Sequence, residues 1–275
     1  MKRLALKVLG QNYRQIIFII VLIGCFFPAF FPIGLPISTS PLTVKAYRFI
    51  EALKADDLVL VSIDYGPGGW AEIGPGMNAV VQHLFLKKVN IVFVSFVTDG
   101  PAMTEKLLKE IDIAGAKYGV NYAILGYMPG DEVAMAAFAE NPLRITKDYY
   151  GNEIGQLDIM KKITTIGDFK LYIPAHITGP EPWIRQFYGK VQTIIMVISP
   201  AALSLVQPWV DSGHLYSMIP GTKGGGEYEV LLRKPGIATS IMDATSLTLT
   251  LVMVLIIIGN IVYRKERSKE VRGGG

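Results

Sequence analysis

The sequence is short of cysteine, histidine and charge. It contains a single cysteine, Cys25, and three histidines among 275 residues. One thiol excludes an intrachain disulfide framework and any metal site built from several cysteines. The chain also lacks the H-E-x-x-H and G-x-S-x-G patterns and any N-x-Ser/Thr glycosylation acceptor. These absences leave no signature for zinc-protease or serine-hydrolase chemistry.

Charged residues make up 18% of the chain and apolar residues 51%, whereas roughly a quarter of a soluble domain is charged. The apolar excess falls in two blocks, 16–37 and 241–263. Each block reaches the roughly 20 residues that a helix needs to cross a bilayer. The sequence therefore predicts a membrane protein with one transmembrane helix at each end. The domain between them, 38–240, is long enough for one sizeable core.

The first block contains no charged residue, and Pro28 and Pro32 lie in its outer half. Proline removes a backbone donor, so a helix here is expected to kink or end near them. A long apolar run without an A-x-A pattern favours an uncleaved anchor over a cleaved signal peptide. Lipoprotein processing stays open as an alternative, because the residues 22–25, Leu-Ile-Gly-Cys, resemble a lipoprotein box.

The second block ends at Tyr263, which is followed by a basic pair and resembles an interfacial anchor. Asp243 lies at its opposite edge and Asn260 lies within it. We expect both side chains to make contacts at or within the membrane. For Asn260 two interpretations stay open: it reaches the headgroups, or it hydrogen-bonds a neighbouring helix.

Basic residues gather in the tails 1–15 and 264–275, outside both blocks. By the positive-inside rule both termini face the cytoplasm, and the domain 38–240 is extracytoplasmic. Residues 15–263 hold 18 Lys and Arg against 21 Asp and Glu. The domain is therefore slightly acidic, which disfavours nucleic acid as a partner and leaves the lipid bilayer as the expected one.

Apolar runs without polar alternation recur through the domain, at 58–63, 91–97, 122–127, 169–173, 192–198 and 214–219. Strands covered on both faces have this pattern. Helical patterns lie before or between them, at 41–55, 77–88, 102–118, 131–139, 155–164 and 200–211. This alternation predicts an α/β, doubly wound, Rossmann-like fold with a mainly parallel sheet and helices on both faces.

Three carboxylates follow predicted strands: Asp64, Asp99 and Asp131. The carboxyl ends of parallel strands meet at one edge, where ligands bind. Together the three side chains could hold a divalent cation with a preference for oxygen ligands. The alternative is that each caps the following helix. No other cofactor is expected.

The most distinctive segment is 220–229, PGTKGGGEYE, about 20 residues before the second block. It contains Gly221, Lys223, Gly224, Gly225, Gly226, Glu227 and Glu229. It is expected to be a loop near the membrane surface that meets lipid headgroups or allows close backbone packing against a partner. A tight connector is the alternative, because glycine gives backbone freedom. Neither a G-x-G-x-x-G nor a P-loop pattern occurs in this segment.

Four motifs follow one another along the chain: PLT-x3-Y-x2-IEAL, LVSIDYGPG, SGHLYSMIPGTKGGGEYE and MDATSLTLTLVMVLIIIGNIVY. In this order they resemble an uncharacterised family of prokaryotic two-span membrane proteins with an extracytoplasmic Rossmann-like domain. The resemblance implies the architecture, and it implies that the Gly-Glu-Tyr-Glu and Met-Asp segments belong to one unit. It implies no activity.

Three functions are compatible with these observations. The first is an extracytoplasmic binding or assembly module that associates with itself or with another membrane protein. The second is a metal-assisted hydrolase or transferase that acts on an envelope or lipid-linked substrate. The third is a small-ligand receptor with a pocket at the switch point of the sheet.

Overall fold

The computed structural model describes the backbone of residues 2–31 and 33–273, with side chains described over 14–28, 31 and 33–264. The chain forms two compact units. One combines Met1–Pro36 with Thr239–Gly275, and the other is Ile37–Ala238. The second unit holds the sheet and is called the α/β unit below.

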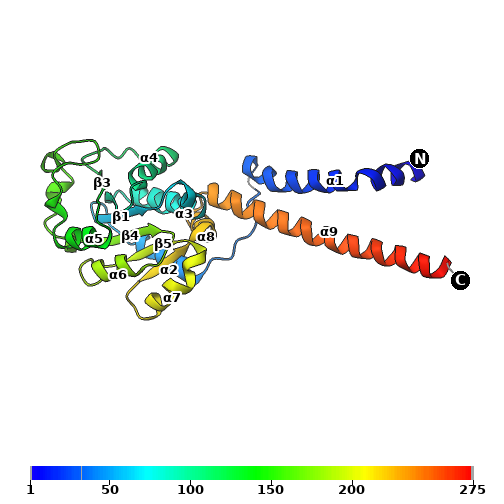
Figure 1. The fold of residues 1–275 in the computed structure, drawn as a ribbon. Coiled ribbons are helices and arrows are strands. Elements are labelled where there is room, and N and C mark those ends of the chain that lie inside the picture. Colours follow the sequence, from blue (N-terminus) through cyan, green and yellow to red (C-terminus); the bar gives the residue numbers. More distant parts are fainter. Residues whose placement is uncertain (1, 32, 274–275) are drawn as a thin grey trace. The chain divides into compact units, whose positions relative to one another are not determined.

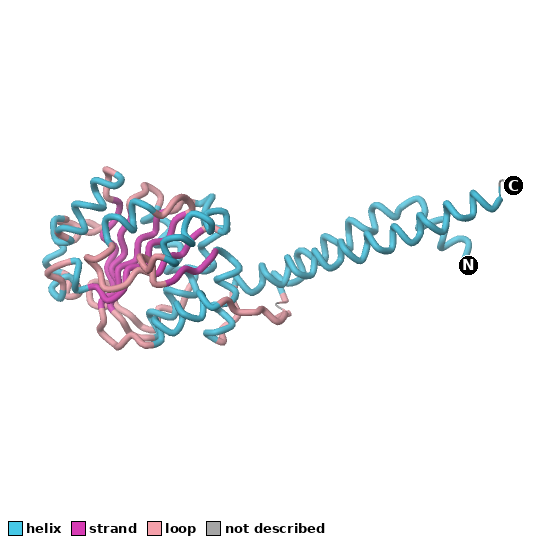
Figure 2. Tube along the Cα trace, turned by 90° about the horizontal axis from the view of Figure 1, so that it is seen from below, coloured by secondary structure: helices cyan, strands magenta, loops and turns pink. Residues whose placement is uncertain are grey.

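The α/β unit is built on six parallel strands in the order β3-β2-β1-β4-β5-β6. Figure 2 shows the strands in magenta. The strands are β1 (Leu58–Asp64), β2 (Asn90–Ser95), β3 (Tyr122–Tyr127), β4 (Phe169–His176), β5 (Ile195–Ile198) and β6 (Ser217–Pro220). The central strand β1 is buried along its whole length. Each apolar run in the sequence has become a strand, and the predicted parallel sheet is confirmed.

Helices cover both faces of this sheet (Figure 1). Along β1, Leu58 and Leu60 face one core, and Val59, Val61 and Ile63 face the other. Residues of α5 (Asp131–Glu140), α6 (Glu181–Phe187) and α7 (Leu203–Asp211) pack in the first core. Residues of α2 (Pro41–Glu51), α3 (Pro67–Leu86), α4 (Gly100–Glu110) and α8 (Gly221–Leu232) pack in the second.

Helix α3 begins at Pro67, ten residues before the predicted start at 77, and contains Pro75. Pro75 has no N–H to offer the carbonyl of Ala71, four residues earlier. The hydroxyl of Thr222 donates to that carbonyl at 3.2 Å. A side chain from α8 therefore supplies the hydrogen bond that the proline removes, and the helix continues through it.

From Gly221 onward the glycine-rich segment is part of α8 (Gly221–Leu232), so the predicted loop was wrong. Its glycines allow two helix backbones to meet: a Cβ added to Gly225 would lie 2.7 Å from the Cα of Gly76 in α3. The packing against α3 outweighs the entropic disadvantage of glycine in a helix, which is roughly 1 kcal/mol per residue.

The helix predicted at 155–164 was also wrong. The segment forms two 3₁₀ turns, η2 (Ile154–Gln156) and η3 (Met160–Lys162). Between them Ile159 donates its N–H to the carbonyl of Gly119 at 3.0 Å, which takes this donor out of any helical ladder. The helix predicted at 102–118 ends at Glu110, because the backbone of Ile111 is extended, and the positive φ angles of Ala114 and Gly115 keep the following residues out of a helix.

The other unit contains α1 (Lys2–Phe30) and, from Thr239 on, α9 (Ile237–Gly273). The predicted span 241–263 lies inside α9, whereas the helix predicted over 16–37 ends at Phe30. A proline at position 32 disfavours helical backbone at residue 31. Among the described residues, the stretch Ile237–Arg264 is long and apolar enough to cross a membrane. The apolar part of α1, Arg14–Pro28, is shorter.

Candidate functional site

The switch point of the sheet lies between β1 and β4. From this pair the chain proceeds to β2 on one side and to β5 on the other. Asp64 ends β1, His176 ends β4, and the two residues are direct partners in the strand register. A crevice for ligand is expected outside such strand ends. The sequence placed Asp64 here but did not single out His176 as its neighbour.

Asp64 is buried, with 4% of its surface exposed. Its carboxylate accepts hydrogen bonds from Trp183 Nε1 and from the backbone N–H of Phe96, both at 2.6 Å. The Ser95 hydroxyl donates at 3.4 Å. Burial raises the pKa of Asp64 to about 6, while these hydrogen bonds act in the opposite direction. The group therefore titrates just below neutral pH.

His176 is packed as an aromatic ring rather than as a hydrogen-bonding group. Its imidazole stacks on the indole of Trp183 with ring centroids 4.1 Å apart and planes within 3°. Neither ring nitrogen has a hydrogen-bond partner in the described part of the chain. Burial lowers the pKa of His176 to about 3. The nearby backbone of Thr178 acts to raise this pKa, but it offsets only part of the effect of burial. The ring is therefore neutral at physiological pH.

Side chains fill the space around this pair. Ser62 and Tyr172 share a buried hydrogen bond of 2.9 Å between their hydroxyls. A Cβ added to Gly69, in the first turn of α3, would lie 2.9 Å from the Cγ2 of Ile177. The centre of the carboxyl edge is therefore a packed polar cluster around Asp64, Trp183 and His176.

The other two predicted carboxylates differ from Asp64 in their surroundings. Asp99 precedes α4 without capping it, and a Cβ added to Gly66 would lie 2.6 Å from its Oδ2. Asp131 is exposed in the first turn of α5 at a positive φ of 47°. Among the described residues no group of three or more His, Cys, Asp or Glu side chains could hold a metal ion. The divalent-cation site predicted from Asp64, Asp99 and Asp131 is therefore not formed as a cluster of ligands among the described residues.

The acidic residues of the glycine-rich segment hold both ends of the α/β unit. Glu227, 1% exposed, accepts from the N–H and the hydroxyl of Ser40 at 3.0 and 2.8 Å. Lys223 lies 3.8 Å from the same carboxylate. Glu229 accepts from the N–H groups of Gly236 and Ala238 at 2.8 and 3.1 Å. These carboxylates therefore fix the segments by which the chain enters and leaves the unit.

Tyr228, between the two glutamates, is buried and belongs to a chain of hydrogen bonds that ends at the half-exposed Glu51. Its hydroxyl lies 2.8 Å from His83 Nδ1, and His83 Nε2 lies 2.8 Å from Glu51. Burial lowers the pKa of His83, and the hydrogen bond to Glu51 opposes this. The sequence offered no signal for this cluster, because 145 residues separate His83 from Tyr228.

The two predicted membrane-helix contacts have different partners. Asp243 is fully buried and accepts from the backbone N–H groups of Ile33, Gly34 and Leu35 at 2.9, 2.8 and 2.9 Å. Asn260 donates to the carbonyl of Ile256 in its own helix at 2.8 Å. That bond is neither of the two contacts expected for Asn260.

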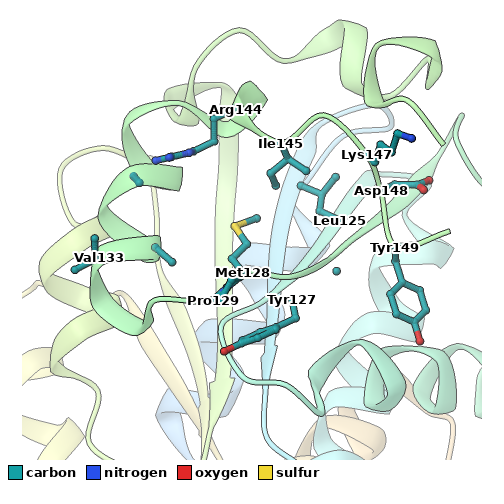
Figure 3. A pocket seen from close by; sticks show the side chains of 13 residues that line it. Leu125, Tyr127, Met128, Pro129, Val133, Arg144, Ile145, Lys147, Asp148 and Tyr149 are labelled. Atoms are coloured by element: carbon teal, nitrogen blue, oxygen red, sulfur yellow. The ribbon is translucent and has the colours of Figure 1, made fainter. Parts of the chain in front are cut away.

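An open pocket of about 550 Å³ lies at the carboxyl end of β3 (Figure 3). It is bounded by the turn after β3, by α5 and by the segment 144–149. We call it the β3 pocket. Leu125, Met128 and Ile145 converge at its middle, and Ala134 and Ala137 line it from α5, where their small side chains leave room.

The polar groups of the β3 pocket differ in how they are engaged. Asp148 accepts from the hydroxyl of Tyr118 at 2.6 Å and from Asn152 at 2.9 Å. Burial acts to raise the pKa of Asp148, but these hydrogen bonds lower it overall. Lys147 lies 3.6 Å from Glu153. Arg144 forms no ion pair with any residue that the structure describes.

The β3 pocket was missed from the sequence, where 140–154 has no periodicity and suggests only a loop. The available signal was compositional: Arg144, Lys147 and two tyrosines follow one another within a few residues of a strand-helix unit. The position of Arg144, Lys147 and Tyr149 along the wall of the pocket depends on how the loop folds back on α5. No periodic pattern encodes that path.

No protein-family model matches the chain. Comparison with curated proteins and with solved structures likewise finds no match.

Proposed function

We propose that this chain is a membrane-anchored extracytoplasmic binding module whose ligand site is the β3 pocket. The observation that carries the proposal is the pocket itself. Its volume of about 550 Å³ falls in the usual range for small-molecule sites, roughly 300–1,000 Å³. An apolar middle with few polar groups at its rim is the usual composition of such sites.

The two-span anchor is part of the proposal. The stretch Ile237–Arg264 has the length and composition to cross a membrane. Helix α1 exposes large apolar side chains from Ile16 to Phe27, and the uncharged sequence continues to position 37. Backbone that leaves a helix at membrane depth needs hydrogen-bond partners. Asp243 supplies them to residues 33–35, which supports a crossing completed beyond Phe30.

Cysteine labelling tests the orientation. In a Cys25→Ser background, one cysteine is placed at the exposed Lys190 and, in a second variant, at Gly275. A membrane-impermeant maleimide added to intact cells should label the Lys190→Cys variant. It should label the Gly275→Cys variant only after permeabilisation. The reverse pattern would overturn the extracytoplasmic placement.

Filling the pocket tests the ligand site. Ala134→Phe places a ring in the β3 pocket, and Ala136→Phe places the same ring on the same helix outside the lining. A library of water-soluble fragments is screened by thermal shift on the full chain in nanodiscs. Fragments that stabilise the wild type and Ala136→Phe, but not Ala134→Phe, support the site. Fragments that stabilise Ala134→Phe equally would contradict it.

Self-association is a second candidate. Tyr127, Tyr149 and Tyr150 are 37, 41 and 52% exposed beside the pocket, and tyrosine with arginine is typical of protein-interaction hot spots. Native mass spectrometry of the purified full chain gives its oligomeric state. A dimer that dissociates in Tyr149→Ala with Tyr150→Ala would favour this function, and a monomer at all concentrations would exclude it.

A further inference from the structure

We infer that the β3 pocket takes a small organic anion, a carboxylate or phosphate monoester attached to an apolar body. This inference rests on the proposed function of the same pocket and adds the chemical class of the ligand. It follows from the charges around the pocket, from the character of its middle and from its size.

The charges leave one strong anion-binding group. The carboxylate of Asp148 is turned to Tyr118 and Asn152, and Glu132 of α5 is engaged by Arg185 and Gln186 at 3.0 and 2.7 Å. Lys147 is only loosely held, because its pair with Glu153 is exposed and spans 3.6 Å. The guanidinium of Arg144 makes no ion pair with any residue that the structure describes, so its N–H groups are available to a ligand. A guanidinium binds a carboxylate or phosphate through two parallel hydrogen bonds.

The middle of the pocket calls for an apolar body. Leu125, Met128 and Ile145 meet there (Figure 3), and two alanines of α5 form one wall. Methionine adapts to the shape of a bound apolar group and makes favourable contacts with aromatic rings. An inorganic anion bound to Arg144 would leave the apolar side chains of the pocket exposed to water. We therefore expect one ligand molecule to carry both the anionic group and an apolar body that covers them.

Three probes of similar shape and different charge test the class: phenyl phosphate, benzyl alcohol and benzylamine. Binding to the full chain in zwitterionic nanodiscs is measured by saturation-transfer NMR and titration. Phenyl phosphate should bind at least tenfold more tightly than the other two, and its affinity should fall as salt is added. Equal affinity for the alcohol or the amine would overturn the inference, and so would no binding of phenyl phosphate at millimolar concentration.

Variants assign the effect to Arg144. Arg144→Gln should weaken phenyl phosphate roughly 10- to 100-fold, since hydrogen bonds to a charged group contribute about 1.5–3 kcal/mol. Lys170→Gln makes the same charge change at the exposed second residue of β4 and should have no effect. Unchanged binding in Arg144→Gln would contradict the inference.

The two proposals fail in different ways. Probes or fragments that Ala134→Phe excludes but Arg144→Gln does not would keep the pocket and reject the anion. Probes that bind Ala134→Phe as well as wild type would reject both.

Discussion

The carboxyl edge of the sheet has two regions of opposite character. At its centre, Asp64, Trp183 and His176 form a packed cluster from which solvent is excluded. At its β3 end, Arg144 and an apolar floor surround an open pocket. The strand order places the expected crevice at the centre. Topology thus fixes where strands end, and the volume of the side chains decides whether a crevice stays open there.

The centre should control the stability of the fold in acid, and this is the largest effect we expect. The pKa of His176 is about 3 in the folded chain and about 6.5 in the unfolded chain. Its contribution is therefore complete above pH 6.5 and is lost as the pH falls toward 3. The loss is on the order of 5 kcal/mol. His176→Phe keeps a stacked ring that cannot titrate, so urea unfolding from pH 7 to 4 should show a flatter profile. An unchanged profile would contradict the burial of a neutral imidazole.

Trp183→Ala opens the centre directly. It removes a buried ring, one donor to Asp64 and the stacking partner of His176. We expect a loss of about 3–5 kcal/mol in the free energy of unfolding. Trp209→Ala is the matched control, because that ring is only partly buried and its loss should be smaller. Equal losses in the two variants would mean that the centre is no more tightly packed than the periphery.

Asp64 should give a pH dependence of the opposite sign. Its pKa rises to about 6 in the folded chain, so between pH 4 and 6 the folded state binds more protons than the unfolded state. Stability from this group falls as the pH rises through that window, by about 3 kcal/mol. Asp64→Asn removes the titrating group but keeps an acceptor for only one of its two close donors, Phe96 N–H or Trp183 Nε1. Its stability relative to wild type should therefore be higher at pH 7 than at pH 4. A variant less stable at pH 7 than at pH 4, relative to wild type, would refute this sign.

The β3 end should contribute little to folding. Arg144→Gln changes a side chain that forms no ion pair with a described residue and lies at the rim of an open pocket. Surface changes of this kind stay within about 0.5 kcal/mol. Chemical denaturation of the variant should match the wild type. A loss above 1 kcal/mol would assign Arg144 to the structure of the loop and remove the contrast between the two regions.

The sheet was predictable because each strand is buried on both faces and needs an unbroken apolar run. The failures have physical causes. Helix α8 carries Gly225 where the backbone of Gly76 in α3 approaches and Gly224 where Pro220 and Ile219 leave no room for a side chain. Helix α3 continues through Pro75 with Thr222 as the partner of the freed carbonyl. At the site, the sequence predicted that Asp64 lies at a strand end. It gave no sign of the hydrogen bond from Trp183, because 119 residues separate the two. The β3 pocket depends on a loop without periodicity.

Hydrogen exchange of the full chain in nanodiscs, with and without phenyl phosphate, distinguishes the β3 pocket from the switch point as the ligand site. We expect slower exchange in 126–130 and 144–150, around the β3 pocket, and no change in 65–70 or 176–179. Protection at 65–70 and 176–179, without protection around Arg144, would contradict this expectation and return the ligand to the switch point.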